Sequence, residues 1–222
     1  MKVIDITLKI QKEMTVFPDP KYGAPELDWI IKPEEDWMGR YSGRLSMHNH
    51  AGTHIDTPMH FNHFPGVNTV DVIPLDVLVG PAIVIGLPEV KTGPITAEML
   101  AEKIPDDIIT EGKRVIIWTG FNDDRWAKPD YFEDVPYFTG DAADWIVEHG
   151  FVLTASDANT DKFGDKKLPV HNTLLANGIY ILEYICNVRE LTMPETFLVV
   201  APLPLKGMEA APARAYVIEE IC

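Results

Sequence analysis

Four of the chain's seven histidines fall in one short segment, HNHAGTHIDTPMH, at residues 48–60. Within it His50, His54, Asp56 and His60 are separated by 4, 2 and 4 positions. Imidazole nitrogens and a carboxylate oxygen are ligands that Zn²⁺ and Mn²⁺ accept, and a small ligand set leaves room for water. Water bound to such an ion loses a proton near neutral pH and becomes a nucleophile. The segment therefore predicts a hydrolytic metal site.

The even spacing of these four residues decides which local structure can bring them together. On a helix the first two would lie on one face and the last two on another. On an extended chain all four share one side, but a straight strand would carry the outer two about 33 Å apart. The segment must therefore bend, and Gly52 and Pro58 suit turns. For His48 and the nearby His63 we expect ordinary hydrogen-bonded or surface roles.

Two residues later in the chain could complete a set of ligands. In IYILEYI (residues 179–185), Glu183 shares a strand face with isoleucines, so a carboxylate lies on an otherwise apolar side. A buried carboxylate needs a partner. That partner is either an Arg or Lys side chain or, alternatively, a metal ion or a histidine bound to it. His171, just before a short predicted helix, is the candidate histidine.

The elements that must position these residues alternate between strands and helices through the middle of the chain. Two β-branched apolar runs, 80–87 and 114–121, are typical of strands buried on both faces. Further strands are predicted over 3–10, 151–156, 179–185, 196–201 and 214–219. Helices are predicted over 97–103 with Thr96 as the N-cap, over 141–149 with Asp141 as the cap, and over 172–177. A long irregular segment is predicted from residue 17, where prolines and a glycine are frequent. The pattern favours an α/β fold with a mixed sheet, either open or curled into a barrel.

Composition narrows the possible functions. The 222 residues carry a net charge of −15, which disfavours nucleic acid and anionic membranes as partners. No apolar run reaches the roughly 20 residues of a membrane helix, and the N-terminus does not read as a secretory signal, so we expect one cytoplasmic domain spanning residues 1–222. The two cysteines, Cys186 and Cys222, form no paired motif, which favours reduced thiols.

The segment HAGTHIDTPMH resembles the HxGTHxDxPxH signature of the cyclase family, which includes bacterial kynurenine formamidases and isatin hydrolases. The resemblance continues through FPDP, WTGF, GDAADWIVEHGFVLTASDANTD, HNTLLANGIYILEYICN and PLPLKGMEAAPARAYVIE, and so spans nearly the whole chain. It implies a compact α/β domain of the swivelling β/β/α type, with a small barrel-like sheet flanked by helices. It also implies a homodimer or homotetramer in which neighbouring subunits contribute to the pocket.

The resemblance also implies roles for individual residues. It assigns His60 as the general acid/base and Asp56 as a carboxylate able to bridge two ions. One or two divalent ions per subunit, Zn²⁺ or alternatively Mn²⁺, would be held by His50, His54, Asp56, His171 and Glu183.

Three departures from the family pattern bear on the substrate and leave the metal chemistry untouched. Phe17 stands where formamidases tend to carry tryptophan, Trp118 stands where a smaller or basic residue is expected, and DANTD (residues 157–161) differs from the usual Asp-x-Pro-Ser-x-Asp. Phe17 and Trp118 are candidates for stacking on an aromatic substrate, with packing in the core as an equal alternative for each.

The leading hypothesis is a metal-dependent hydrolase of a small non-peptide amide, with arylformamidase, which cleaves N-formylkynurenine, as its best-known form. Metal-bound hydroxide would attack the carbonyl, and His60 would pass a proton to the departing nitrogen. One alternative is an isatin hydrolase-like enzyme, or another enzyme that opens a cyclic amide, imide or lactone on the same scaffold. Another is a metal-binding or small-molecule-binding protein without turnover.

Overall fold

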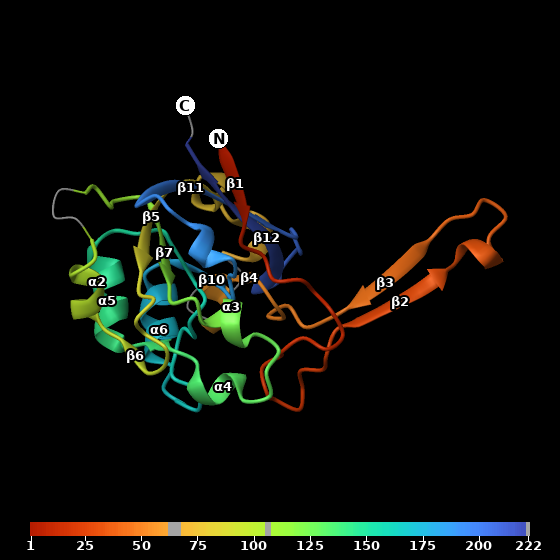
Figure 1. Cartoon of the computed structure of the whole chain (residues 1–222), viewed down its shortest axis with the longest axis horizontal. Coiled ribbons are helices and arrows are strands. Elements are labelled where there is room, and N and C mark those ends of the chain that lie inside the picture. The colour runs from red at the N-terminus through yellow and green to blue at the C-terminus, as the bar shows by residue number, and fades with distance from the viewer. Residues whose placement is uncertain (62–67, 105–107, 221–222) are drawn as a thin grey trace.

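The computed structural model describes residues 1–61, 68–104 and 108–220. Within these ranges one mixed sheet of eight strands forms the centre of the molecule, and pairing of its last strand with β12 closes seven of them into a barrel (Figure 1). In sheet order the strands are β1 (Lys2–Asp5), β12 (Ala210–Glu219), β11 (Glu195–Pro202), β5 (Val79–Gly86), β7 (Arg114–Trp118), β9 (Leu153–Ser156), β10 (Tyr180–Glu183) and β4 (His54–Asp56). The predicted mixed α/β fold with a barrel-like sheet is confirmed.

The parallel part of the sheet is buried on both faces, as its apolar runs predict. β5, β7, β9 and β10 pair in parallel, whereas β4, β11 and β12 pair antiparallel. Ile116 packs with apolar side chains of the other strands inside the barrel. Its neighbour Ile117 points the other way and packs beneath the helices. Because side chains on both faces of these strands are packed among apolar residues, a polar site can form only where a strand ends or a helix begins.

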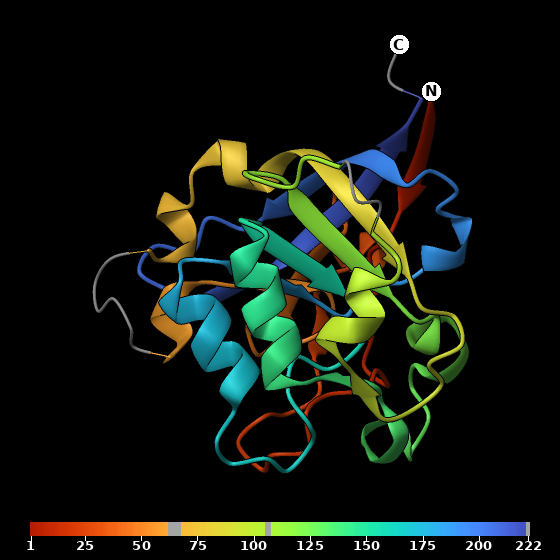
Figure 2. The same ribbon diagram turned by 90° about the vertical axis from the view of Figure 1, so that its left-hand side faces the viewer.

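The helices among the described residues are α1 (Leu75–Leu78), α2 (Ala97–Ala101), α3 (Phe121–Arg125), α4 (Tyr131–Asp134), α5 (Gly140–Glu148) and α6 (Pro169–Ala176). Of these, α2, α5 and α6 cover one outer face of the sheet, as the view in Figure 2 shows most clearly. α5 packs against both α2 and α6, and the apolar faces of these three helices lie over Ile117 and Ile181. A helix that could cross a membrane was not found among the described residues.

The predicted starts of the helices agree with the structure for α2 but not for α5 and α6. The Thr96 hydroxyl caps α2 by accepting from the Met99 amide, as predicted. For α5 the predicted Asp141 cap is wrong, because the helix begins one residue earlier and Asp141 instead accepts a hydrogen bond from the Ala97 amide at 2.9 Å. α6 begins at Pro169, so His171 lies inside the first turn of this helix and not before it. Proline is favoured at this position because its missing N–H costs nothing there.

Two small sheets lie outside the barrel. β6 (Pro94–Ile95) pairs with β8 (Tyr137–Phe138) near the helices. β2 (Glu26–Ile31) and β3 (Ser42–Ser46) form a hairpin that projects away from the barrel in Figure 1. The sequence prediction of an irregular segment from residue 17 did not include this hairpin.

Candidate metal centre

β4 is a three-residue strand that turns alternate side chains to opposite sides of the barrel wall. Ile55 joins the apolar interior, so His54 and Asp56 face the outside beneath α6. The chain bends on both sides of this strand, as the spacing predicts. Gly52 has a φ of 69°, which favours glycine, and Pro58 begins a 3₁₀ turn at Pro58–Phe61. These bends return the flanking histidines toward the strand.

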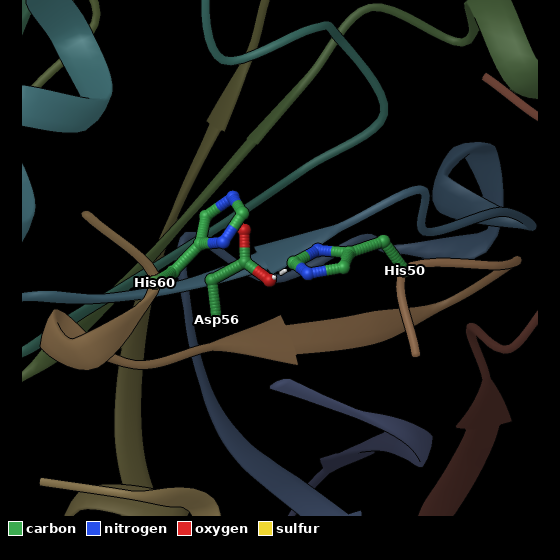
Figure 3. Close-up of side chains that lie close together, drawn as sticks. All are labelled: His50, Asp56 and His60. Carbon is green, nitrogen blue, oxygen red and sulfur yellow. Dashed lines mark ion pairs between the residues drawn. The ribbon is translucent and has the colours of Figure 1, made fainter. Parts of the chain in front are cut away.

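The predicted residues of the first segment do converge, with Asp56 at their centre. The Nδ1 atom of His50 lies 2.9 Å from Asp56 Oδ1, and the Nε2 atom of His54 lies 3.3 Å from the same oxygen. Figure 3 shows the Asp56 carboxylate between the rings of His50 and His60. A side-chain nitrogen or oxygen from each of His50, Asp56 and His60 falls within 4.8 Å of the others.

The two downstream candidates reach the same point from β10 and α6. Glu183 pairs in register with His54, and its Oε2 lies 3.4 Å from His54 Nε2. His171 approaches from the first turn of α6, with Nε2 3.8 Å from both Asp56 Oδ2 and Glu183 Oε1. The structure therefore gathers His50, His54, His171 and Glu183 around the carboxylate of Asp56.

Asp56 provides the test of whether these residues suit a cation. Its side chain is fully buried, and within the described residues neither carboxylate oxygen accepts a well-formed hydrogen bond. A buried carboxylate without donors is costly unless positive charge compensates it. The surrounding groups are imidazole nitrogens and a second carboxylate, the donor set of Zn²⁺ and Mn²⁺. These residues fit a divalent metal ion.

Each of the three surrounding imidazoles is held by an acceptor on its outer nitrogen. His54 Nδ1 lies 2.8 Å from the carbonyl oxygen of Gly52, and His171 Nδ1 lies 2.6 Å from Asp161 Oδ2. His50 Nε2 lies 3.2 Å from a carboxylate oxygen of Glu209. When such a ring is neutral, the acceptor on the outer nitrogen keeps the one proton there, so the inner nitrogen would be free to offer its lone pair to a bound cation. This is the arrangement that a metal ligand requires.

The electrostatics of the group follow from its excess of acceptors. Burial would lower the pKa of His50, but the negative charge of Asp56 beside it raises this pKa to about 10. Burial likewise opposes protonation of His171, yet the hydrogen bond to Asp161 and the negative charges of Glu183 and Asp56 raise its pKa to about 10. Burial disfavours the charged form of Asp56, but His50 and His54 lower its pKa well below the usual range. Without a metal, protons on His50 and His171 therefore supply the positive charge that balances Asp56.

His60 differs from the other histidines of the group. Within the described residues no side chain hydrogen-bonds to its ring, which packs 4.3 Å from the ring of His50 and 4.8 Å from that of Phe61. Burial and the charges of His50 and His171 lower the pKa of His60 to about 4, against the opposing effect of Asp56. The imidazole is therefore neutral at pH 7 and open to the cavity.

Residues that hold the centre in place were not singled out from the sequence. Asp161 accepts hydrogen bonds from the Val170 and His171 amides as well as the His171 ring. The Thr160 hydroxyl donates a short hydrogen bond to Glu183. Asp161 and Thr160 lie in DANTD, and the only sequence feature that could have identified them is the presence of a carboxylate and a hydroxyl in that segment. Glu209 is 159 positions from its partner His50, so no local pattern could have paired them.

A cavity of about 600 Å³ opens onto the group. Beside the charged and polar residues of its wall, the cavity is lined by aromatic side chains, namely Phe17, Tyr22, Phe61, Phe163 and Tyr184. Phe17 lies in this lining, with its ring 5.8 Å from that of Phe163, and its role in stacking on a substrate stays a prediction. Trp118 does not line the cavity, because it lies at the end of β7 against Gly86 and the barrel interior. This position agrees with packing in the core, the alternative to a stacking role that the sequence left open for Trp118.

The histidines outside the group have ordinary environments. His48 packs between rings, 3.8 Å from that of Tyr22 and 5.0 Å from that of His50, and its Nδ1 accepts a hydrogen bond from the His50 amide. His149 ends α5 and stacks on Trp145 at 3.9 Å. His63 lies outside the described residues.

Comparison with known proteins places this geometry in context. The model of the family named Cyclase matches residues 4–161. A protein named kynurenine formamidase from Bacillus cereus is 29% identical over 217 residues, covering 96% of each chain.

Two solved structures share the fold. A potential metal-dependent hydrolase with cyclase activity is 30% identical and has a TM-score of 0.76. The match covers 100% of this chain and 99% of that chain. An isatin hydrolase bound to the product analogue thioisatinate has a TM-score of 0.87 at 20% identity, with 98% of this chain and 92% of that chain covered. The second likeness concerns the fold alone.

Proposed function

The chain belongs to the cyclase family, and we propose that it is a metal-dependent hydrolase that cleaves the carbon–nitrogen bond of a small non-peptide amide. The arylformamidase type is the form of this activity we favour, because a full-length relative is named kynurenine formamidase. The observation that carries the proposal is the convergence of His50, His54, His171 and Glu183 on the buried, donor-free carboxylate of Asp56.

These five residues would hold the metal. The two oxygens of Asp56 face different partners, Oδ1 toward His50 and His54 and Oδ2 toward His171. A second potential ligand group, formed by His54, Asp56 and Glu183, shares Asp56 with the group that contains His50 and His60. This sharing supports a site in which Asp56 would serve either one ion or two, and the choice of Zn²⁺ over Mn²⁺ stays a prediction. When bound, such an ion polarises a carbonyl and lowers the pKa of water.

His60 would carry the proton between water and the leaving group. Its ring lines the cavity and is neutral at pH 7, so one ring nitrogen can accept a proton. A cation with a pKa of about 4 readily gives that proton up, and the departing nitrogen of an amide requires one. His60 would therefore act first as base and then as acid. Its closeness to His50 and Asp56 also allows it to be a ligand, which metal analysis of a variant distinguishes.

The cavity would bind an aromatic substrate. Phe17 and Phe163 form part of one wall with their rings tilted edge to face, and the Phe61 ring lies parallel to that of His171 at 4.9 Å. Flat apolar surfaces of this kind favour an aromatic ring and exclude water from around the reacting bond. Lys162 and Lys166 at the same cavity would attract a negatively charged group on the substrate.

A cyclic aromatic amide of the isatin type is the second candidate. The fold likeness to an isatin hydrolase and a cavity large enough for a two-ring system favour it. Ring opening needs the same groups, since His60 would protonate the same kind of nitrogen. The two candidates differ only in whether the departing nitrogen leaves the molecule.

The test is a panel of substrates assayed on the protein loaded separately with Zn²⁺, Mn²⁺ and Co²⁺. The panel contains N-formylkynurenine, formanilide, isatin and a simple lactone. Preferential hydrolysis of the two formamides is the expected result, and preference for isatin would select the second candidate. Absence of turnover with every substrate and metal would contradict the proposal and favour a binding protein. A homo-oligomeric assembly and a cytoplasmic location stay predictions.

A further inference from the structure

Two polar side chains in the lining of the cavity, Asn159 and Tyr184, are not among the candidate metal ligands. Asn159 is 7% exposed and Tyr184 is 8% exposed. Within the described residues neither the Asn159 carboxamide nor the Tyr184 hydroxyl makes a hydrogen bond. Buried amides and phenols usually have a partner, and leaving one unpaired is unfavourable. A bound molecule in the cavity is the partner that both side chains lack.

Tyr184 reaches the cavity because its backbone departs from that of a strand. On β10 Leu182 points into the barrel and Glu183 points away from it, so regular alternation would return Tyr184 to the interior. Its φ is instead 57°, a left-handed value that is uncommon for a bulky residue. The ring packs beside Tyr131 and lines the cavity, and the Thr53 hydroxyl holds the backbone by donating to the Tyr184 carbonyl at 2.7 Å. Backbone strain of this kind is frequent at ligand sites.

The backbone of Asn159 is fixed on both sides of its side chain. Its amide donates to the carbonyl of Pro136 at 2.8 Å, and its carbonyl accepts from the amide of Phe138 at 3.3 Å. The carboxamide oxygen is fully buried, so the Nδ2 amino group is the end open to the cavity. Asn159 stands at the proline position of the Asp-x-Pro-Ser-x-Asp pattern from which DANTD departs. Since proline has no side-chain donor, this hydrogen-bonding group is particular to this chain.

Both side chains lie next to the candidate metal centre through Glu183. Tyr184 directly follows Glu183 in the chain. Asn159 directly precedes Thr160, whose hydroxyl donates a short hydrogen bond to the Glu183 carboxylate. The other oxygen of this carboxylate lies 3.4 Å from Nε2 of His54. The two unpaired groups therefore lie at the end of the cavity where the reacting bond would be held.

The open ends of both side chains are hydrogen-bond donors. A phenol has an ordinary pKa of about 10 and so keeps its proton at neutral pH, and a carboxamide amino group only donates. The acceptor on the bound molecule is therefore an oxygen. The carboxylate of Glu183 beside these donors disfavours a second negatively charged group. A neutral carbonyl oxygen, carried on a ring that packs against the aromatic part of the wall, is the acceptor that fits.

We propose that Asn159 and Tyr184 are specificity-determining residues that bind a second carbonyl oxygen of the substrate, separate from the carbonyl that is attacked. This inference rests on the proposed function and narrows its substrate class to aromatic amides with a ketone on the ring position next to the amide nitrogen. N-formylkynurenine and isatin both carry such a ketone, whereas formanilide does not. The two donors would therefore favour the first two molecules over formanilide.

Two substrates that differ only in this ketone test the assignment. Formanilide and 2-acetylformanilide are assayed on the metal-loaded protein, and the ratio of their kcat/KM values is compared between variants. We expect Asn159→Leu and Tyr184→Phe each to lower the preference for 2-acetylformanilide by about 3- to 10-fold, the effect of one lost hydrogen bond, with unchanged metal content.

Tyr131→Phe is the matched control for these variants. It removes a buried phenol from the same aromatic cluster, but this phenol donates to Asn122 and does not line the cavity. The control should keep the ratio of the wild type. An unchanged ratio in Asn159→Leu and Tyr184→Phe, or an equal fall in the control, would overturn the proposal. A change in one variant alone would remove the other residue from it.

Binding of the corresponding amines tests the same contacts without turnover. 2-Aminoacetophenone and aniline differ by the same ketone, and their Kd values are measured by calorimetry on the wild type and the variants. We expect the wild type to prefer 2-aminoacetophenone, with a smaller preference in Asn159→Leu and Tyr184→Phe and an unchanged one in Tyr131→Phe. Equal preference in all four proteins would contradict the proposal. Ketone-dependent binding without hydrolysis of either formamide would contradict the proposed function alone.

Discussion

Asp56 is the residue on which the candidate centre depends. Its full burial and the lack of donors to either oxygen are tolerable only with positive charge beside it, either as protons on the histidines or as a metal ion. The raised pKa values of His50 and His171 belong to the first case. In the second case these protons must leave, so metal binding should tighten as pH rises. Proton release and metal uptake are therefore coupled.

His60 is the residue whose substitution separates chemistry from metal binding. His60→Gln should leave the metal content near that of the wild type and lower kcat by about 10²-fold or more, because a general acid/base is lost. The measurement is elemental analysis of the purified variant together with kcat under saturating substrate. Loss of metal in this variant would instead make His60 a ligand, and an unchanged kcat would remove it from the mechanism.

Asp161 positions His171, and its substitution should act through the metal. In the wild type the Asp161 carboxylate accepts hydrogen bonds from two backbone N–H groups and the ring N–H of His171, and Asp161→Asn replaces it with a neutral amide. We expect metal affinity to fall by about 10- to 100-fold, as measured by competition with a chelator of known affinity. Asp165→Asn, in the neighbouring loop, is the matched control. Equal affinities for the two variants would contradict the role assigned to Asp161.

The residue types and spacing predicted much of the centre but not its supports. Parity and the bends at Gly52 and Pro58 indicated that His50 and His60 would return to β4, and the structure agrees. Glu183 was recognised because a carboxylate interrupts an apolar strand face. Glu209 could not be recognised in this way, because its role depends only on long-range contact with His50.

At the scale of elements, the loop between β7 and α3 depends on a buried carboxylate away from the centre. Asp157 follows β9 and accepts hydrogen bonds from the backbone amide and hydroxyl of Thr119. Burial raises the pKa of Asp157 to about 6 despite these donors. Its second oxygen is buried and has no hydrogen-bond partner among the described residues.

This carboxyl should make stability depend on pH. In the unfolded chain it ionises at about 3.8 and in the folded chain at about 6, so between these values the folded state holds a proton that the unfolded state has released. Its contribution to the free energy of unfolding is therefore fully present below about pH 3.8 and is lost as pH rises through about 6. The loss is about 3 kcal/mol by order of magnitude.

Urea unfolding of Asp157→Asn and the wild type at pH 4 and pH 7 measures this contribution. The amide does not ionise, so the variant should gain stability relative to the wild type at the higher pH. A difference between the two proteins that is the same at both pH values would contradict the assignment.

Elements with strong local patterns were predicted well, and those that depend on distant contacts were not. β5 and β7 were identified by continuous apolar runs, and α2 by its Thr96 cap. The β2–β3 hairpin was missed because prolines and glycines precede it and its apolar side chains face outward, so its sequence lacks the pattern of a strand with one buried face. For Trp118 the sequence left stacking and core packing open, because a single large aromatic residue looks the same in sequence whether it lines a cavity or ends a buried strand.

At the scale of the whole molecule, the centre connects elements that are distant in sequence. β4, β10 and α6 contribute the ligand residues, and Glu209, immediately before β12, holds His50. A metal bound here would stabilise the barrel closure between β4 and its two neighbours. Barrel closure itself is beyond local sequence signals, because β4 is only three residues long and pairs with strands far along the chain.

Removal of metal should therefore lower the melting temperature of the entire protein. A ligand present at a hundredfold excess over its Kd stabilises the folded state by about 2.7 kcal/mol. We expect a chelator to lower the Tm of the wild type by several degrees and to leave that of Asp56→Asn unchanged. The same shift in both proteins would mean that the chelator acts elsewhere than at this centre.

The central claim is that metal held around Asp56 enables amide hydrolysis, and a reconstitution titration tests it most directly. Metal is removed with a chelator and returned in steps, while bound metal per chain and the rate of formamide hydrolysis are measured on the same samples. We expect a rate that is near zero without metal, rises with bound metal and stops rising at one or two ions per chain, with neither uptake nor activity in Asp56→Asn. Full hydrolytic activity in the metal-free protein, or an Asp56→Asn variant that binds metal and works like the wild type, would contradict it.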